Sequence, residues 1–166
     1  MVMSLDLGKG LEVIFDDLDY DLISPYKWYR LKRTHTFYAA AKIKLENGKT
    51  TSLLMHRLLT QAPCGFDVDH ADRNGLNNTR QNLRVCTRTQ NQANSQKRKT
   101  KYGKPTSSQY KGVYRSEDKL RWRAQLGSHK YLGTFGTEIE AAEAYNNAAR
   151  AAYGEFASLN LIPIKG

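Results

Sequence analysis

Residues 68–91 read VDHADRNGLNNTRQNLRVCTRTQN, and this stretch decides how the centre of the chain folds. Alternating polar and apolar residues predict a strand over residues 66–70 and a second short strand over residues 83–86. The Asn-, Gly- and Asp-rich segment between them predicts a polar loop, and a helix is expected from about Thr89. Asp69 and His70 are neighbours on the first strand, so their side chains point to opposite faces. One side chain can therefore hold a cation while the other meets a water molecule.

Four residues of this stretch, Asp69, His70, Asn82 and Asn91, have the types and spacing that a one-metal site for DNA cleavage requires. Hydrolysis of a phosphodiester needs a water, a base that takes its proton and a positive charge beside the phosphate. Asp69 can supply a hard oxygen ligand for Mg²⁺ or Mn²⁺, and Asn91 an amide oxygen. His70, with an ordinary pKa of about 6.5, can act as the general base at pH 7. Asn82 is expected to brace the loop and to orient the imidazole.

Each of these residues has a simpler interpretation when it is taken singly. An isolated Asp69 would more often be a cap or an ion-pair partner, and an Asn in a Gly-rich loop is usually a turn former. The remaining polar residues of the loop are expected only to form its turns, namely Asp72, Asn74, Asn77 and Asn78. The joint spacing favours catalysis over these alternatives.

The net charge of +10 and the pI of about 9.6 are unevenly placed along the chain. Residues 95–131 hold 11 basic and 2 acidic side chains, and tyrosines and a tryptophan are interleaved with them. A block of this kind can be a solvated tail, but with aromatic residues it is more typical of a surface that binds a polyanion. The composition therefore favours nucleic acid as the partner.

The two cysteines argue against a zinc cluster or a disulfide framework. Cys64 and Cys86 form no CxxC pair, so no zinc is expected, and both thiols are predicted to be reduced and at least partly buried. No apolar run approaches the roughly 18 residues of a membrane span, and the start lacks the order of a secretion signal. We expect a soluble protein of the cytoplasm, with no membrane partner.

The length of 166 residues allows one compact domain or two to three small modules. Strands are expected over much of residues 11–55, with a type I′ hairpin at Asn47-Gly48, because both central positions of that turn need a positive φ. A short helix over residues 56–62 is predicted to stop at Pro63. Residues 95–108 read as an extended basic linker without regular structure.

Residues 109–160 predict three strands followed by one helix. In residues 120–126, LRWRAQL, Trp122, Ala124 and Leu126 fall on one face, and the basic and amide side chains fall on the other. Thr137 and Glu140 have the spacing of a capping box, and Gly154 is placed to end the helix. One face of this sheet is therefore expected to be core and the other to meet a partner.

The stretch from His56 to Asn94 resembles the HNH nucleases, specifically the homing-endonuclease branch whose ββα-metal motif uses Asp-His, Asn and Asn. The resemblance implies a strand, a loop, a second strand and a crossing helix, with Asp69 and Asn91 holding one cation. It implies that His70 activates water and that Asn82 fixes the geometry.

Two further residues enter through the same resemblance. Arg88 is expected to touch the scissile strand. His56 fits the upstream helix of the family, either as a phosphate contact or as a structural hydrogen-bonding histidine.

The segment from Tyr110 to Asn160 is similar to the AP-two or ethylene-response-factor DNA-binding domain, through YKGV, KYLGTF, EAAEAYNNAA and the final LN. The resemblance implies three antiparallel strands in the major groove, backed by a helix. Tyr114 stands where an arginine is usual and Tyr131 where a tryptophan is usual, so the plant target sequence cannot be carried over. The expected DNA-binding residues of this module are Lys111, Tyr114, Arg115, Arg121, Arg123, Gln125, His129, Lys130 and Tyr131.

Together these features predict an α+β protein with an N-terminal β region (1–55), an HNH nuclease core (56–94), a basic linker (95–108) and a DNA-binding domain (109–166). The expected activity is that of a site-specific homing-type endonuclease of a phage or mobile element, acting on double-stranded DNA with one divalent metal, as a monomer or homodimer. One active site per chain predicts a nick in one strand. A catalytically inactive DNA-binding regulator and an RNA-directed protein are the alternatives. The N-terminal sheet is either a scaffold or a further DNA contact.

Overall fold

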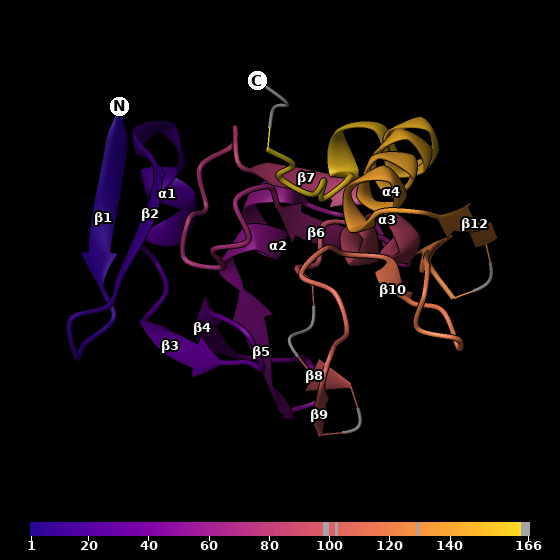
Figure 1. Cartoon of the computed structure of the whole chain (residues 1–166). Helices are drawn as coiled ribbons and strands as arrows, with labels where there is room; N and C mark the ends of the chain where they lie inside the picture. Colours follow the sequence, from indigo (N-terminus) through magenta and orange to yellow (C-terminus); the bar gives the residue numbers. More distant parts are fainter. Residues whose placement is uncertain (98–99, 102, 129, 164–166) are drawn as a thin grey trace. The chain divides into compact units, whose positions relative to one another are not determined.

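The computed structural model describes residues 1–97, 100–101, 103–128 and 130–163. Over these residues the chain is α+β, as the sequence predicts, with several small antiparallel sheets and few helices (Figure 1). It forms two compact units, residues 1–91 (unit 1) and residues 92–166 (unit 2). His129, one of the predicted DNA contacts, lies outside the described residues.

Unit 1 consists of short strands joined in hairpins, with three small helices, the third of which extends two residues into unit 2. Its elements in chain order are β1 (Val2–Asp6), β2 (Glu12–Asp16), a 3-10 turn (Asp17–Asp19), α1 (Tyr20–Ile23), β3 (Trp28–Lys32), β4 (Phe37–Lys44), β5 (Thr50–Leu54), α2 (Met55–Thr60), β6 (Asp67–His70), β7 (Leu83–Cys86) and α3 (Arg88–Ala93). β1 pairs with β2, β3, β4 and β5 form one sheet, and β6 pairs with β7. β6, β7 and α3 follow the predicted strands and helix, whereas β1 is not among the predicted strands.

The core of unit 1 anchors the loop that lies between β6 and β7. Val13 and Phe15 alternate with Ile14 along β2 and are fully buried with Ile23 and Met55, and each such side chain contributes about 1.5–3 kcal/mol by leaving water. The backbone of Ile14 accepts a hydrogen bond from the loop at 2.7 Å and donates one to it at 2.9 Å. The hydrophobic core therefore fixes the position of a polar loop.

Two predictions about turn residues of unit 1 are wrong. The hairpin between β4 and β5 is present, but only Gly48 has a positive φ (78°), and Asn47 does not. The Gly48 N–H donates to the Leu45 carbonyl, and the Leu45 N–H donates to the Lys49 carbonyl, which is a three-residue loop with glycine at the left-handed position. Cys64 is exposed, because it lies in the turn before β6.

α2 ends earlier than predicted. Its last helical residue is Thr60, and Gln61 adopts a left-handed conformation with φ 48°. The guanidinium of Arg57 donates to the carbonyls of Ala62 at 3.1 Å and Phe66 at 3.0 Å. These bonds hold the turn that leads into β6.

Unit 2 is a three-stranded sheet packed on one long helix. Its elements are β8 (Thr100–Lys101), β9 (Lys104–Pro105), β10 (Val113–Arg115), β11 (Trp122–Leu126), β12 (Lys130–Phe135), α4 (Glu138–Tyr153) and a 3-10 turn (Gly154–Phe156). Sheet order is β10-β11-β12. β8 and β9 lie within residues 95–108, for which no regular structure is predicted. No helix in the described part of the chain is long and apolar enough to cross a membrane.

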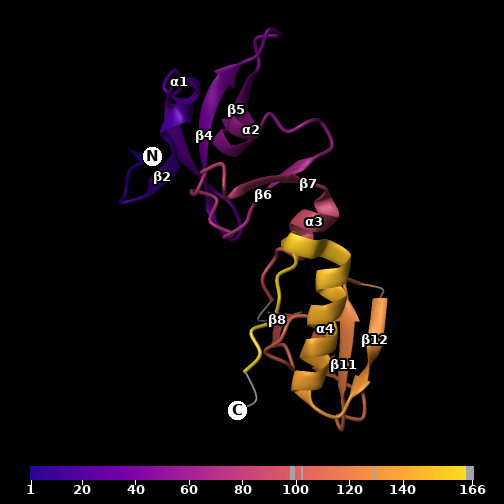
Figure 2. The same ribbon diagram turned by 90° about the horizontal axis from the view of Figure 1, so that it is seen from above.

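α4 begins and ends where the sequence predicts. The Thr137 hydroxyl and the Glu140 side chain form both bonds of the capping box, and Gly154 follows the last turn with φ 53°. Figure 2 shows α4 lying along β11 and β12. The alanines of its inner face are buried, which permits this close approach. At Gly112, with φ 75°, a Cβ would lie 2.1 Å from the ring of Tyr145, so only glycine fits there.

Candidate functional site

The hairpin of β6 and β7 sorts the polar residues of the site onto two faces. Asp67 and Asp69 alternate with Val68 and His70 along β6, so the two carboxylates share one face and the imidazole takes the other. Register pairs Asp69 with Arg84 and His70 with Leu83. The strand pattern of the sequence thus separates an acidic face from an imidazole face.

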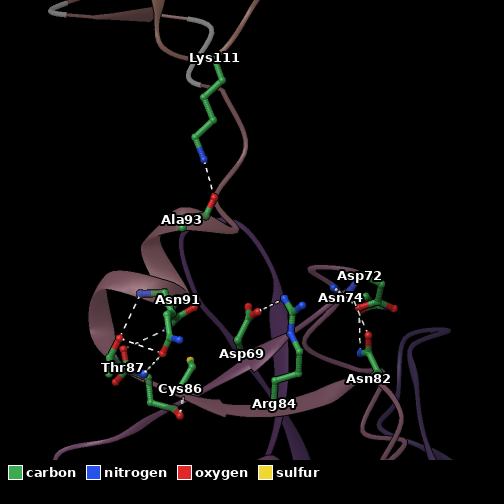
Figure 3. Close-up of polar contacts among 12 residues, drawn as sticks. Asp69, Asp72, Asn74, Asn82, Arg84, Cys86, Thr87, Asn91, Ala93 and Lys111 are labelled. Atoms are coloured by element: carbon green, nitrogen blue, oxygen red, sulfur yellow. Dashed lines mark hydrogen bonds and ion pairs between the residues drawn. The ribbon is translucent and has the colours of Figure 1, made fainter. Parts of the chain in front are cut away.

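The acidic face holds a tight ion pair. An Nη2 of Arg84 donates to Oδ2 of Asp69, and the two side chains are 15% and 5% exposed (Figure 3). The carboxylate is thus shielded from bulk water, and a guanidinium compensates its charge. Arg84 enters the site because antiparallel register sets it directly across from Asp69.

Asn91 reaches the same face from α3. Its Nδ2 donates to Oδ2 of Asp67 at 3.1 Å, and its backbone N–H donates to the carbonyl of Thr87 at 3.0 Å. The start of α3 is ordered by Gln90, whose Oε1 accepts from the backbone and hydroxyl of Thr87 at 2.9 and 3.0 Å. Figure 3 shows Asp69 between Asn91 and Arg84. Oxygen-bearing side chains of β6 and α3 therefore converge beside the ion pair.

His70 is buried within a group of rings on the other face. Its ring centroid lies 5.6 Å from that of Tyr38 in β4 and 5.1 Å from that of His56 in α2. Burial lowers the pKa of His70 below 6.5, while a hydrogen bond with Asn78 and the charges of Asp72 and Asp69 act in the opposite direction. The imidazole is therefore neutral at pH 7, as a general base must be.

His56 packs edge-on against its neighbours. Its ring centroid is 5.1 Å from those of Tyr38 and His70, with interplanar angles of 60° and 86°. Burial, then the charge of His70 and that of Arg57, lower its pKa to about 3. His56 is 7% exposed and cannot carry a proton near neutrality. Its surroundings match a structural histidine better than a phosphate contact.

The Asn82 side chain braces the loop between β6 and β7. Its Oδ1 accepts from the Asp72 N–H at 2.9 Å, and its Nδ2 donates to Oδ1 of Asp72 at 2.9 Å and to the Asn77 carbonyl at 2.7 Å. Burial alone would raise the pKa of Asp72, but hydrogen bonds from Asn74, Asn77 and Asn82 lower it below its usual range. The loop is held as one hydrogen-bonded unit with Asn82 at its centre.

The residues that face His70 were only partly predicted. Asn82 is expected from the sequence to orient the imidazole, but its side chain bonds to Asp72 and Asn77, and the amide that acts on the pKa of His70 is that of the fully buried Asn78. Asp67 and Arg84 also belong to the site without having been singled out. For these two, the signal in the sequence was strand alternation: Asp67 is two residues before Asp69, and Arg84 is two residues after Asn82.

Unit 2 presents an array of rings and guanidinium groups on its sheet. The guanidinium carbon of Arg123 lies 5.7 Å from the ring centre of Tyr114 and 5.2 Å from that of Tyr131. The Tyr114 hydroxyl donates to Oε1 of Gln125 at 2.8 Å. Three further predicted contacts, Arg115, Arg121 and Lys130, are exposed. Strand parity in β11 is as predicted, since Ala124 and Leu126 are buried and Arg123 and Gln125 are not.

Lys111 differs from the other predicted DNA contacts. Its ammonium donates to the carbonyl of Ala93 at 2.7 Å (Figure 3) and to that of Ser95 at 2.6 Å. It thus satisfies the carbonyl of the last residue of α3 and one that lies just beyond the helix. The ammonium of Lys111 is therefore engaged in hydrogen bonds within unit 2.

Comparison with known proteins finds a family match over the central stretch of the chain. The family described as HNH endonuclease matches residues 61–93. A protein of Acanthamoeba polyphaga mimivirus, described as an uncharacterized HNH endonuclease, is 35% identical over 163 residues, which are 95% of this chain and 79% of the relative. The chain belongs to the HNH endonuclease family. Within this HNH protein, the matched residues include β6, β7 and α3.

A second likeness concerns a shorter segment of the HNH protein. Over 48 residues it is 50% identical to the AP2-like ethylene-responsive transcription factor ANT of Arabidopsis thaliana, which is 26% of this chain and 9% of that protein. Over 60 residues it is 47% identical to the dehydration-responsive element-binding protein 2D of the same plant, 33% of this chain and 29% of that protein. No solved structure matches the chain significantly.

The acidic face of the HNH protein has a donor set that fits a hard divalent cation. Asp69 and Asp67 supply carboxylate oxygens and Asn91 an amide oxygen, which are ligands that Mg²⁺ and Mn²⁺ prefer. Within the described residues, no three His, Cys, Asp or Glu side chains cluster as a metal site. A cation held by these oxygens would complete its shell with phosphate and water.

Proposed function

We propose that the protein is a site-specific DNA endonuclease of the homing type that hydrolyses phosphodiester bonds with one Mg²⁺ or Mn²⁺. The observation that carries this proposal is the buried, neutral His70, set back to back with Asp69 on β6. A base without charge at pH 7 and a carboxylate on the opposite face are what one-metal hydrolysis needs.

Each residue of the site has a distinct role in this proposal. His70 takes a proton from the attacking water, and the rings of Tyr38 and His56 hold its imidazole. Asp69 and Asn91 would hold the cation, and Asn82 keeps the loop in place. A cation bound there supplies positive charge beside the phosphate and the departing 3′ oxygen. With one such site per chain, a monomer cuts one strand, and a double-strand break requires a homodimer or two events.

The sheet of unit 2 is proposed to read double-stranded DNA. The likeness to AP2-like transcription factors supports this assignment, because a small sheet fits the major groove. Arg121 and Arg123 have the side chains that pair with guanine. Tyr114 lies under the guanidinium of Arg123 and donates a hydrogen bond to Gln125. Arg88, exposed at the start of α3, is proposed to contact the cut strand.

The test is cleavage of supercoiled plasmid libraries of candidate target sites, incubated with Mg²⁺ or Mn²⁺. We expect a metal-dependent relaxed product that disappears in the Asp69→Ala and His70→Ala variants. Two exposed residues of unit 1 provide matched controls, and we expect Asp21→Ala and His35→Ala to cut normally.

Intact plasmid with every library and metal, together with tight duplex binding, would contradict the endonuclease and favour a catalytically inactive DNA-binding regulator. Competition between duplex DNA and RNA for the protein tests the choice of nucleic acid. Stronger displacement by RNA would contradict DNA as the partner.

A further inference from the structure

The ion pair between Asp69 and Arg84 bears on how the site takes up its metal. Asp69 is directly across from Arg84 in the β6 and β7 register, and the carboxylate has 5% of its side-chain surface exposed. A carboxylate in so little water needs a compensating positive charge. In this structure the guanidinium of Arg84 provides it.

A divalent cation at Asp69 would bring a second positive group to the same carboxylate. The guanidinium of Arg84 is a cation, and it is itself only 15% exposed. Two like charges in a site with little water repel each other more strongly than they would in solution. Arg84 thus opposes cation binding, and until a phosphate enters, the carboxylate of Asp67 on the same face is the charge that counters this repulsion.

A DNA phosphate is a negative charge that the reaction itself brings to this place. Its oxygens can bind the cation and accept hydrogen bonds from a guanidinium at the same time. With phosphate present, the repulsion between Arg84 and the cation is offset. The same two positive groups then both stabilise the bound substrate.

We propose that Arg84 holds the Asp69 carboxylate in the metal-free protein and makes metal binding depend on DNA. The inference rests on the proposed one-metal site at Asp69. Its consequence is that the protein alone binds Mg²⁺ or Mn²⁺ weakly and becomes loaded when a phosphate enters. In the metal-free protein the carboxylate of Asp67 holds Asn91 on the same face through the 3.1 Å hydrogen bond.

Removal of the guanidinium separates this role from simple stabilisation. We expect Arg84→Met to bind Mn²⁺ roughly tenfold tighter than the wild type in the absence of DNA, which corresponds to a coupling of about 1.4 kcal/mol. The same variant should have a lower Tm without metal, because a buried carboxylate loses its partner. Arg84→Lys keeps the charge and should bind Mn²⁺ as weakly as the wild type.

The chain offers a control in another arginine–aspartate pair of unit 1, in which the aspartate is buried and the Arg80 side chain is 59% exposed. Arg80 donates to both oxygens of Asp19, at 3.1 and 2.5 Å, and Asp19 is fully buried. Arg80→Met should lower the Tm in the same way but leave the Mn²⁺ affinity unchanged. A loss of stability by itself therefore cannot imitate the expected result.

The measurement is calorimetric titration of Mn²⁺ into the full chain, with and without a random-sequence duplex at low salt. A His70→Ala background prevents cutting. In that background we expect DNA to tighten Mn²⁺ binding strongly when Arg84 is present, and only slightly in Arg84→Met. Asp69→Asn should abolish the Mn²⁺ signal in every background.

The outcomes distinguish this inference from the proposed function. If Mn²⁺ binds with DNA and needs Asp69, but Arg84→Met binds it no tighter than the wild type, the role of Arg84 is refuted and the metal site stands. If Mn²⁺ never binds at Asp69, with or without DNA, both proposals are refuted.

Discussion

Replacement of His56 by phenylalanine should remove a large part of the acid sensitivity of unit 1. The folded protein keeps His56 neutral because burial, with the charges of His70 and Arg57, lowers its pKa from 6.5 to about 3. The unfolded chain exposes the imidazole, which takes up a proton near pH 6.5. The unfolded state therefore binds more protons between these two values, and stability falls as the pH falls from 6.5 towards 3.

The size of the effect follows from the difference between the two pKa values. Each pH step below 6.5 costs about 1.4 kcal/mol while the folded imidazole stays neutral. At pH 5 the protein should thus have lost roughly 2 kcal/mol of unfolding free energy relative to pH 7 through His56 alone. This loss is fully present only below the folded pKa and is absent above 6.5.

The assay is urea unfolding at pH 7 and pH 5. The chain has two tryptophans, so a Trp122→Phe background leaves Trp28 as a fluorescent probe of unit 1. His56→Phe retains a ring of similar size against Tyr38 and His70 and cannot titrate. The loss on going from pH 7 to pH 5 should be about 2 kcal/mol smaller in the variant. Equal losses, within about 0.5 kcal/mol, would refute the assignment of the acid sensitivity to His56.

Four further outcomes can be checked on the same protein. Gly112→Ala should lower the unfolding free energy of unit 2 by at least about 3 kcal/mol, because the new Cβ would lie 2.1 Å from Tyr145. In Gly127→Ala the nearest atom is 3.9 Å away, so the loss measured by urea unfolding should be only roughly 1–2 kcal/mol. For the nuclease reaction, kcat/KM should stay level from pH 8 to 6.5 and decline below, since burial lowers the pKa of His70 below 6.5, and a decline centred above 6.5 would contradict this. Asn82→Ala removes three hydrogen bonds of the loop and should cost about 2 kcal/mol and slow cleavage strongly, as thermal melts and nicking rates would reveal. Duplex affinity should fall on the order of a thousandfold between about 50 and 200 mM salt in a binding titration, and a flat response would argue against phosphate contacts.

The elements with local signals could be predicted from the sequence. β6 and β7 follow from alternation in VDH and LRVC, and α4 follows from the capping box at Thr137 and from Gly154. The prediction was wrong where the same short sequence is compatible with two types of turn. Asn47-Gly48 fits a two-residue turn, but the chain forms a longer loop in which only Gly48 needs a positive φ.

The contacts among residues distant in sequence came from the tertiary structure. Nothing local indicates that Tyr38 and His56 surround His70, because these rings come from β4, α2 and β6. The sequence predicts only a loop residue at Asn78, whereas the folded unit 1 buries this side chain beside the imidazole of His70.

By itself the sequence determined β6, β7, α4 and the residue types of the site, because alternation, capping and spacing depend only on neighbours along the chain, and the HNH family was indicated by resemblance. The tertiary structure decided that Arg84 neutralises Asp69 and that Lys111 bonds to Ala93 and Ser95. Such pairings depend on strand register and on how the core packs. Each pairing depends on the folding free energy of the whole unit, and a short segment of the sequence does not determine it.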